Sequence, residues 1–131
     1  MIVTTPSNEV ETRLLLTSAL NFDGPAPVRY PRGSGPNKTF EESLNEIPIG
    51  KANLIREGDK KSIILNFGAL LHEAEKVAES LNLTLIDMRF VKPLDEDILK
   101  NHLKQADLVI TLEDGCICLL YTSDAADDRL R

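Results

Sequence analysis

The sequence predicts an α/β fold with a mainly parallel sheet. Apolar, β-prone runs alternate with amphipathic helical stretches, and the loops between them are short. Such alternation requires right-handed crossovers, which place neighbouring strands parallel to each other. A polar stretch over residues 34–48, rich in Ser, Gly, Pro and Asn at its start, separates two units of this kind and reads as a linker.

The composition is that of an ordinary globular protein and argues against several classes of function. The chain has 131 residues, of which 42% are hydrophobic and 27% charged, and its net charge is −6. An acidic chain without a Lys/Arg cluster disfavours nucleic acid and anionic membrane surfaces as partners. No apolar run approaches the roughly 20 residues of a membrane span. The absence of a signal peptide and of a disulfide framework predicts a cytoplasmic protein.

The first unit, residues 1–33, is expected to fold as strand, helix and strand. A short strand is predicted at residues 2–5, and Ser7 is placed to cap a helix over about residues 8–20. An Asp-Gly-Pro turn follows, and residues 26–30 return as a strand. Two strands and one helix cannot form an independent core, so we expect this unit to be the end of a larger domain.

The second unit, residues 49–117, is expected to be a partial α/β domain. Its most β-prone run, residues 62–67, is continuously apolar, as in a strand buried on both faces. Asp95 is placed to cap a helix. In chain order we expect an edge strand at 49–56, a turn at 57–60, a strand at 62–67, a helix at 70–82, a strand at 84–89, a helix ending near 105 and a strand at 107–112.

Residues 27–33, with the sequence Pro-Val-Arg-Tyr-Pro-Arg-Gly, are the best candidate for anion recognition. Pro31 cannot donate to a sheet and therefore marks a strand end, and an arginine fork suits phosphate or carboxylate. Arg32 lies beyond that strand end and beside a glycine, so we rank it above Arg29, which can be a structural strand residue. The alternative is a pair of surface arginines with carboxylate neighbours.

The other chemistry-bearing residues form no catalytic constellation. Cys116 and Cys118 lack the further ligands of a tetrahedral metal site. His72 and His102 lie on predicted helices as surface groups. The cations Arg89 and Lys92 lie near a strand end, where they face a ligand, a partner domain or solvent. The carboxylates near strand ends or helix starts form no convincing acid–base pair; they are Asp87, Asp95 and Asp97.

Residues 118–131 show neither helical nor strand periodicity. Their run Cys-Leu-Leu-Tyr-Thr-Ser-Asp-Ala-Ala-Asp resembles the conceptual translation of a transposon-type sequencing adapter. We therefore expect a non-native tail, with the natural sequence broken off near Ile117.

Several runs, in a fixed order, carry a family resemblance. They are Thr5-Pro6-Ser7, Asp23-Gly24-Pro25, Val28-Arg29-Tyr30-Pro31-Arg32-Gly33, Pro48-Ile49-Gly50-Lys51 and Asp87-Met88-Arg89-Phe90-Val91-Lys92-Pro93-Leu94-Asp95. Over residues 1–117 the chain resembles the 1-deoxy-D-xylulose-5-phosphate synthases, which are thiamine-diphosphate enzymes of the transketolase group. The alternatives are another transketolase-type protein, such as a pyruvate dehydrogenase β subunit, and a non-catalytic α/β interaction module.

The resemblance implies a transferase. Such enzymes condense pyruvate with D-glyceraldehyde 3-phosphate to 1-deoxy-D-xylulose 5-phosphate and CO₂, for isoprenoid, thiamine and pyridoxal synthesis. They use thiamine diphosphate and Mg²⁺ and are cytoplasmic homodimers. The family arginine that contacts the acceptor phosphate falls on Arg32. Residues 1–33 become the end of the pyrimidine-binding domain, and residues 49–117 become part of the transketolase C-terminal domain.

The family's cofactor machinery is missing from this sequence. Its diphosphate- and Mg²⁺-binding Gly-Asp-Gly segment, its catalytic histidines and its activating glutamate have no counterpart here. We therefore expect no catalytic residue in this chain, and neither cofactor binding nor turnover by the chain alone.

Overall fold

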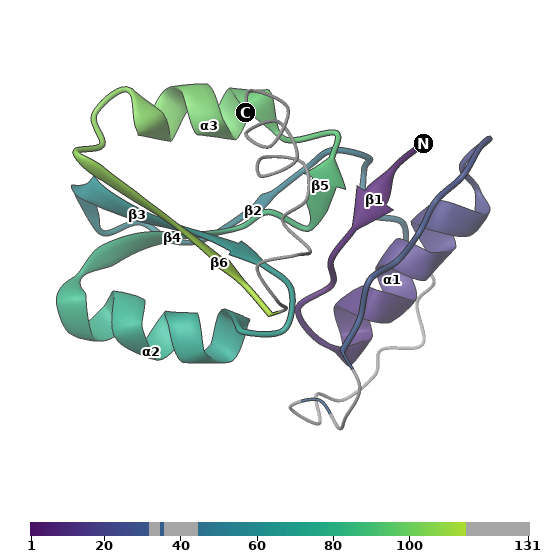
Figure 1. The fold of residues 1–131 in the computed structure, drawn as a ribbon, viewed down its shortest axis with the longest axis horizontal. Coiled ribbons are helices and arrows are strands. Elements are labelled where there is room, and N and C mark those ends of the chain that lie inside the picture. Colours follow the sequence, from purple (N-terminus) through teal and green to yellow (C-terminus); the bar gives the residue numbers. More distant parts are fainter. Residues whose placement is uncertain (32–34, 36–44, 115–131) are drawn as a thin grey trace, which may run out of the picture.

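The computed structural model describes residues 1–31, 35 and 45–114 (Figure 1). Four sequence predictions fall outside these residues: the role of Arg32, most of the linker, the Cys116/Cys118 pair and the 118–131 tail. Among the described helices, none has the length and apolar character needed to cross a membrane.

Four strands form the main sheet, in the order β2-β4-β3-β6. Strand β3 (Asp59–Phe67) lies at the centre and pairs in parallel with β4 (Leu83–Asp87) and with β6 (Leu108–Glu113). Strand β2 (Asn53–Arg56) runs antiparallel to β4 at one edge. The predicted α/β class with a mainly parallel sheet is thereby confirmed.

Two helices cover the sheet from opposite sides, α2 (Leu71–Leu81) on one face and α3 (Glu96–Leu103) on the other (Figure 1). Ile64 of β3 packs in the cluster with α2, whereas its neighbour Ile63 packs in the cluster with residues of α3. Successive side chains of a strand point to opposite faces, so burial on both faces explains the continuous apolar run of β3.

The N-terminal unit lies beside this sheet (Figure 1). Strand β1 (Val3–Thr4) pairs antiparallel with β5 (Phe90–Lys92), which follows β4 closely in the chain. Helix α1 (Glu9–Leu20) contributes Leu15 to a buried cluster with Ile2, Ile47 and Phe90. The unit is therefore joined to the domain both by strand pairing and by a shared apolar cluster.

The cap of α1 differs from the prediction. Asn8, and not Ser7, is the N-cap, and its Oδ1 accepts a hydrogen bond from the Glu11 N–H at 3.0 Å. Ser7 instead donates from its N–H and its hydroxyl to the Glu11 carboxylate. The predicted Asp95 cap of α3 is confirmed, because its Oδ1 accepts from the Ile98 N–H at 3.3 Å.

The predicted strand at residues 26–30 is reduced to a single parallel bridge between Val28 and Thr4. Pro25, Pro27 and Pro31 have no N–H to donate, so the segment offers mainly acceptors to β1. The Pro25 and Pro27 carbonyls accept from β1 and its neighbour Ile2, and only Arg29 donates back, to the Thr4 carbonyl.

Further boundaries differ from the prediction. Strand β2 begins at Asn53, four residues later than the expected edge strand. Strand β3 begins at Asp59, inside the predicted turn, and β4 ends at Asp87, two residues earlier than expected. Arg89 has a left-handed φ of 58° and redirects the chain into β5, a strand that the sequence did not predict.

Candidate functional site

A cleft of about 320 Å³ lies where the carboxyl ends of β3 and β6 meet the N-terminal unit. Its walls are Thr5, residues 28–31, residues 67–69 at the end of β3, and Glu113 with Asp114 at the end of β6. Ligands of parallel α/β sheets usually bind beyond the carboxyl ends of the strands. The cleft therefore occupies the position at which the topology favours a ligand.

Arg29 lies at this cleft and forms an ion pair. Its Nη2 is 2.6 Å from Oε1 of Glu113, and its side chain is about one-third exposed. The pair joins the segment before the linker to the end of β6. For this arginine, the structure thus shows the carboxylate-paired arrangement that the sequence left as the alternative.

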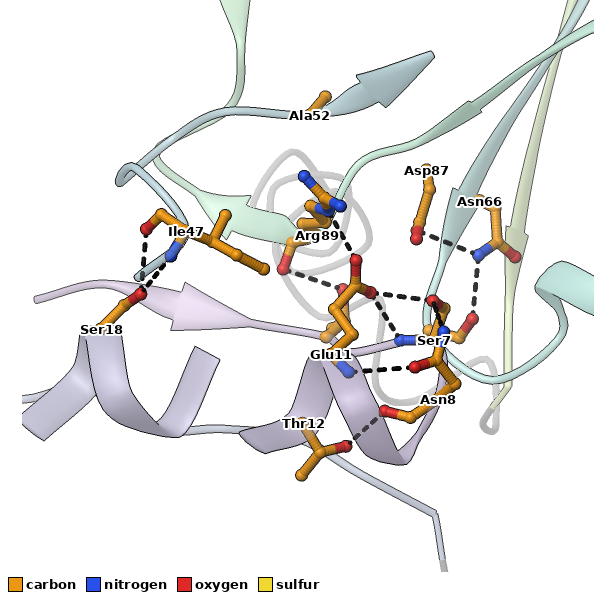
Figure 2. Close-up of polar contacts among 12 residues, drawn as sticks. Ser7, Asn8, Glu11, Thr12, Ser18, Ile47, Ala52, Asn66, Asp87 and Arg89 are labelled. Carbon is orange, nitrogen blue, oxygen red and sulfur yellow. Dashed lines mark hydrogen bonds and ion pairs between the residues drawn. The ribbon is translucent and has the colours of Figure 1, made fainter. Parts of the chain in front are cut away.

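A network of largely buried polar groups links the start of α1 to the chain just after β4 (Figure 2). Glu11 accepts at both carboxylate oxygens. Its Oε1 is 2.6 Å from Nε of Arg89, and its Oε2 is 2.9 Å from the Ser7 nitrogen and 2.8 Å from the Ser7 hydroxyl. Three donors thus compensate a carboxylate that is only 6% exposed, as a buried charge requires.

Arg89 is the cation of this network. Its guanidinium donates through Nε to Glu11, 78 residues away in the chain, and its side chain is 21% exposed. Its backbone carbonyl accepts from the N–H of Thr5, which lines the cleft. No partner for its Nη1 or Nη2 occurs among the described residues.

Asp87 is the second buried carboxyl group, at the last position of β4. Asn66 donates from Nδ2 to Asp87 Oδ1 at 3.3 Å and to the Gly68 carbonyl at 2.9 Å. Asp87 Oδ2 has no hydrogen-bond partner among the described residues. Burial and then the negative charge of Glu11 raise the pKa of Asp87 to about 7.

Sequence reasoning missed this network. It compared Asp87 only with carboxylates close in the chain, whereas the structure brings it to Glu11 of a distant helix. Asp95 and Asp97 lie at the start of α3, as expected, where Lys51 Nζ approaches them at 3.5 and 3.2 Å. No local sequence pattern links residues 11 and 89. Only their positions, at a helix start and after a strand end, could have suggested that they form a pair.

The remaining candidates show no site chemistry. Lys92 is exposed on β5. His72 is exposed near Glu75, and Nδ1 of His102 lies 2.8 Å from the Ile98 carbonyl. Within residues 1–31 and 45–114, no three His, Cys, Asp or Glu side chains group closely enough to hold a metal ion.

Comparison with known protein families and sequences gives three results. The family described as "Transketolase, C-terminal domain" matches residues 50–119. The "1-deoxy-D-xylulose-5-phosphate synthase" of Hahella chejuensis is 50% identical over 117 residues, which are 89% of this chain and 18% of that protein. The protein of the same description from Pseudomonas aeruginosa PAO1 is 49% identical over 117 residues.

A solved structure is also similar. It is described as "Split gene transketolase, inactive beta4 tetramer", with a TM-score of 0.73 and 26% identity over 85% of this chain and 38% of the other. The chain thus spans less than a fifth of the length of the curated relatives, 18% of the Hahella protein.

Proposed function

Because this chain belongs to the transketolase C-terminal domain family, we propose that it forms part of a 1-deoxy-D-xylulose-5-phosphate synthase. The observation that carries the proposal is the 50% identity to the Hahella chejuensis synthase over 117 residues. The whole enzyme condenses pyruvate with D-glyceraldehyde 3-phosphate and releases CO₂, in the cytoplasm and as a homodimer. Residues 1–33 then end the pyrimidine-binding domain, and residues 34–48 link it to the C-terminal domain at 49–117.

Within this function we assign the acceptor's phosphate to cations at the carboxyl edge of the sheet. Arg32 is the first candidate, because it follows a proline strand end and precedes a glycine. Arg29 is the weaker candidate, since Glu113 already compensates its charge. The geometry adds Arg89, which lies after the end of β4 and whose Nη1 and Nη2 have no partner among the described residues. Its left-handed φ of 58° also supports a functional role, because such conformations cluster at ligand sites.

Thiamine diphosphate and Mg²⁺ belong to the proposed whole enzyme. The family's diphosphate- and Mg²⁺-binding Gly-Asp-Gly segment has no counterpart in this sequence. We therefore place both cofactors on parts of the enzyme outside this segment. The present chain supplies an edge that binds and orients the acceptor.

The proposal is tested in a chimera, in which the matched segment of this chain replaces the corresponding 117 residues of the Hahella chejuensis synthase. We expect the chimera to form 1-deoxy-D-xylulose 5-phosphate. In it, Arg32→Ala removes a charge-assisted phosphate contact of about 1.5–3 kcal/mol, so kcat/KM for D-glyceraldehyde 3-phosphate should fall about 10- to 100-fold. The KM for pyruvate should stay within about twofold, because pyruvate carries no phosphate.

Arg29→Ala is the matched control, since it removes an arginine three residues away that is paired with Glu113. We expect it to have the smaller effect on the acceptor. An inactive chimera that is correctly folded would contradict the proposed function. Unchanged acceptor kinetics in Arg32→Ala would contradict the assignment of Arg32 alone.

A further inference from the structure

Glu11 is held more firmly than a helix-surface carboxylate requires. Its backbone N–H donates to the Asn8 cap at 3.0 Å, and its Oε2 accepts from both the N–H and the hydroxyl of Ser7. Backbone and side chain are therefore fixed by two consecutive residues before α1. At 6% exposure, the carboxylate cannot exchange these donors for bulk water without opening the junction.

The remaining oxygen of Glu11 is directed at one atom of Arg89. Oε1 lies 2.6 Å from Nε, and the other two guanidinium nitrogens have no partner among the described residues. A guanidinium is planar, so fixing Nε together with the side-chain stem fixes the directions of both Nη groups. The side chain as a whole is 21% exposed.

The backbone of Arg89 is fixed as well. Its φ of 58° is left-handed, and its carbonyl accepts from the Thr5 N–H at 2.7 Å. Thr5 lines the cleft at the carboxyl edge. The N-terminal segment thus holds Arg89 at two points, through Thr5 at the main chain and through Glu11 at the side chain.

We propose that Glu11 is a positioning residue of the synthase: its carboxylate orients the guanidinium of Arg89 so that Nη1 and Nη2 bind the phosphate of the acceptor. This inference rests on the proposed function and on the place of Arg89 in it. Glu11 itself does not touch the substrate. It restricts the orientations of the Arg89 side chain before the phosphate binds. Less conformational entropy is therefore lost on binding.

The test uses the chimeric synthase with Glu11→Gln, Glu11→Asp and Arg89→Ala. Gln places an NH₂ group opposite either Arg89 or Ser7, both of which are donors, and Asp keeps the charge but shortens the reach. For both Glu11 variants we expect KM for D-glyceraldehyde 3-phosphate to rise about 5- to 30-fold, with kcat changed less than about threefold. Inhibition by inorganic phosphate should weaken by a similar factor.

Selectivity for phosphate separates positioning from a structural role. KM for pyruvate and for unphosphorylated D-glyceraldehyde should stay within about twofold of the chimera's values. Glu96→Gln is the control, because it makes the same change at an exposed carboxylate in the first turn of α3. It should leave all these constants unchanged.

The outcomes separate the role of Glu11 from that of Arg89 and from the proposed function. An effect of Arg89→Ala on the phosphorylated acceptor, without an effect of either Glu11 variant, overturns the role of Glu11. If Arg89→Ala has no effect on the phosphorylated acceptor, Arg89 does not belong to the phosphate site and this inference is overturned. Product formation by the chimera would still support the proposed synthase function. Equal losses toward all substrates, or loss of folding in both Glu11 variants, would make Glu11 structural and overturn the inference.

Discussion

Asp87→Asn should raise the free energy of unfolding of this chain at pH 8 and flatten its dependence on pH. Burial and the charge of Glu11 raise the pKa of Asp87 from 3.8 to about 7 in the folded state. The folded state therefore binds the proton more tightly than the unfolded chain. The stabilisation from this group is complete below pH 3.8 and is lost as the pH rises to about 7. A shift of about three pKa units corresponds to an upper limit of about 4 kcal/mol.

Urea denaturation between pH 4 and pH 8 measures this effect. Asparagine resembles the protonated acid, so Asp87→Asn should approach the low-pH stability at every pH. Asp97→Asn is the control, because the Asp97 side chain is 81% exposed. The compared quantity is the free energy of unfolding of the wild-type chain relative to that of Asp87→Asn. If it does not fall between pH 4 and pH 7, Asp87 is ionised in the folded protein at neutral pH, which contradicts the raised pKa.

Leu15→Ala should destabilise the chain by about 2–5 kcal/mol, as expected for a large-to-small change at a fully buried site. Leu15 is 0% exposed and packs with Ile2, Ile47 and Phe90. These residues join α1 and β1 to the end of the sheet. The cavity would therefore form at the junction of the two units and weaken their attachment to each other.

The adjacent Leu16 provides the control, since it is on the same helix but 43% exposed. Leu16→Ala should cost less than about 1 kcal/mol. Chemical denaturation gives both values, and hydrogen exchange localises the change. Equal destabilisation by the two substitutions would contradict the packing described for α1.

Much of the fold could be predicted from local patterns, because its central elements depend on them. The apolar run of β3 and the periodic stripe of α2 specify buried elements without reference to distant residues. Strand β5 has no such pattern. It exists because Arg89 turns the chain and β1, almost 90 residues away, provides its partner.

The candidate site could be predicted only in part, for the same reason. The strand ends and the arginines were visible in the sequence as ligand-facing positions. The bond between Glu11 and Arg89 spans 78 residues, and the raised pKa of Asp87 depends on burial that no local pattern shows. Even the α1 cap was assigned one residue early, because Ser7 and Asn8 are both good caps and Ser7 is used by Glu11.

The pairing of β1 with β5 also sets an order of events during synthesis on the ribosome. Phe90, the partner of Thr4, is translated more than 80 residues after it. At about 5–20 residues per second, β1 waits roughly 5–15 s for a strand to pair with. Until then the buried cluster of Ile2, Leu15 and Ile47 lacks Phe90. The pairing of β1 and its buried cluster are thus completed only after β5 has been synthesised.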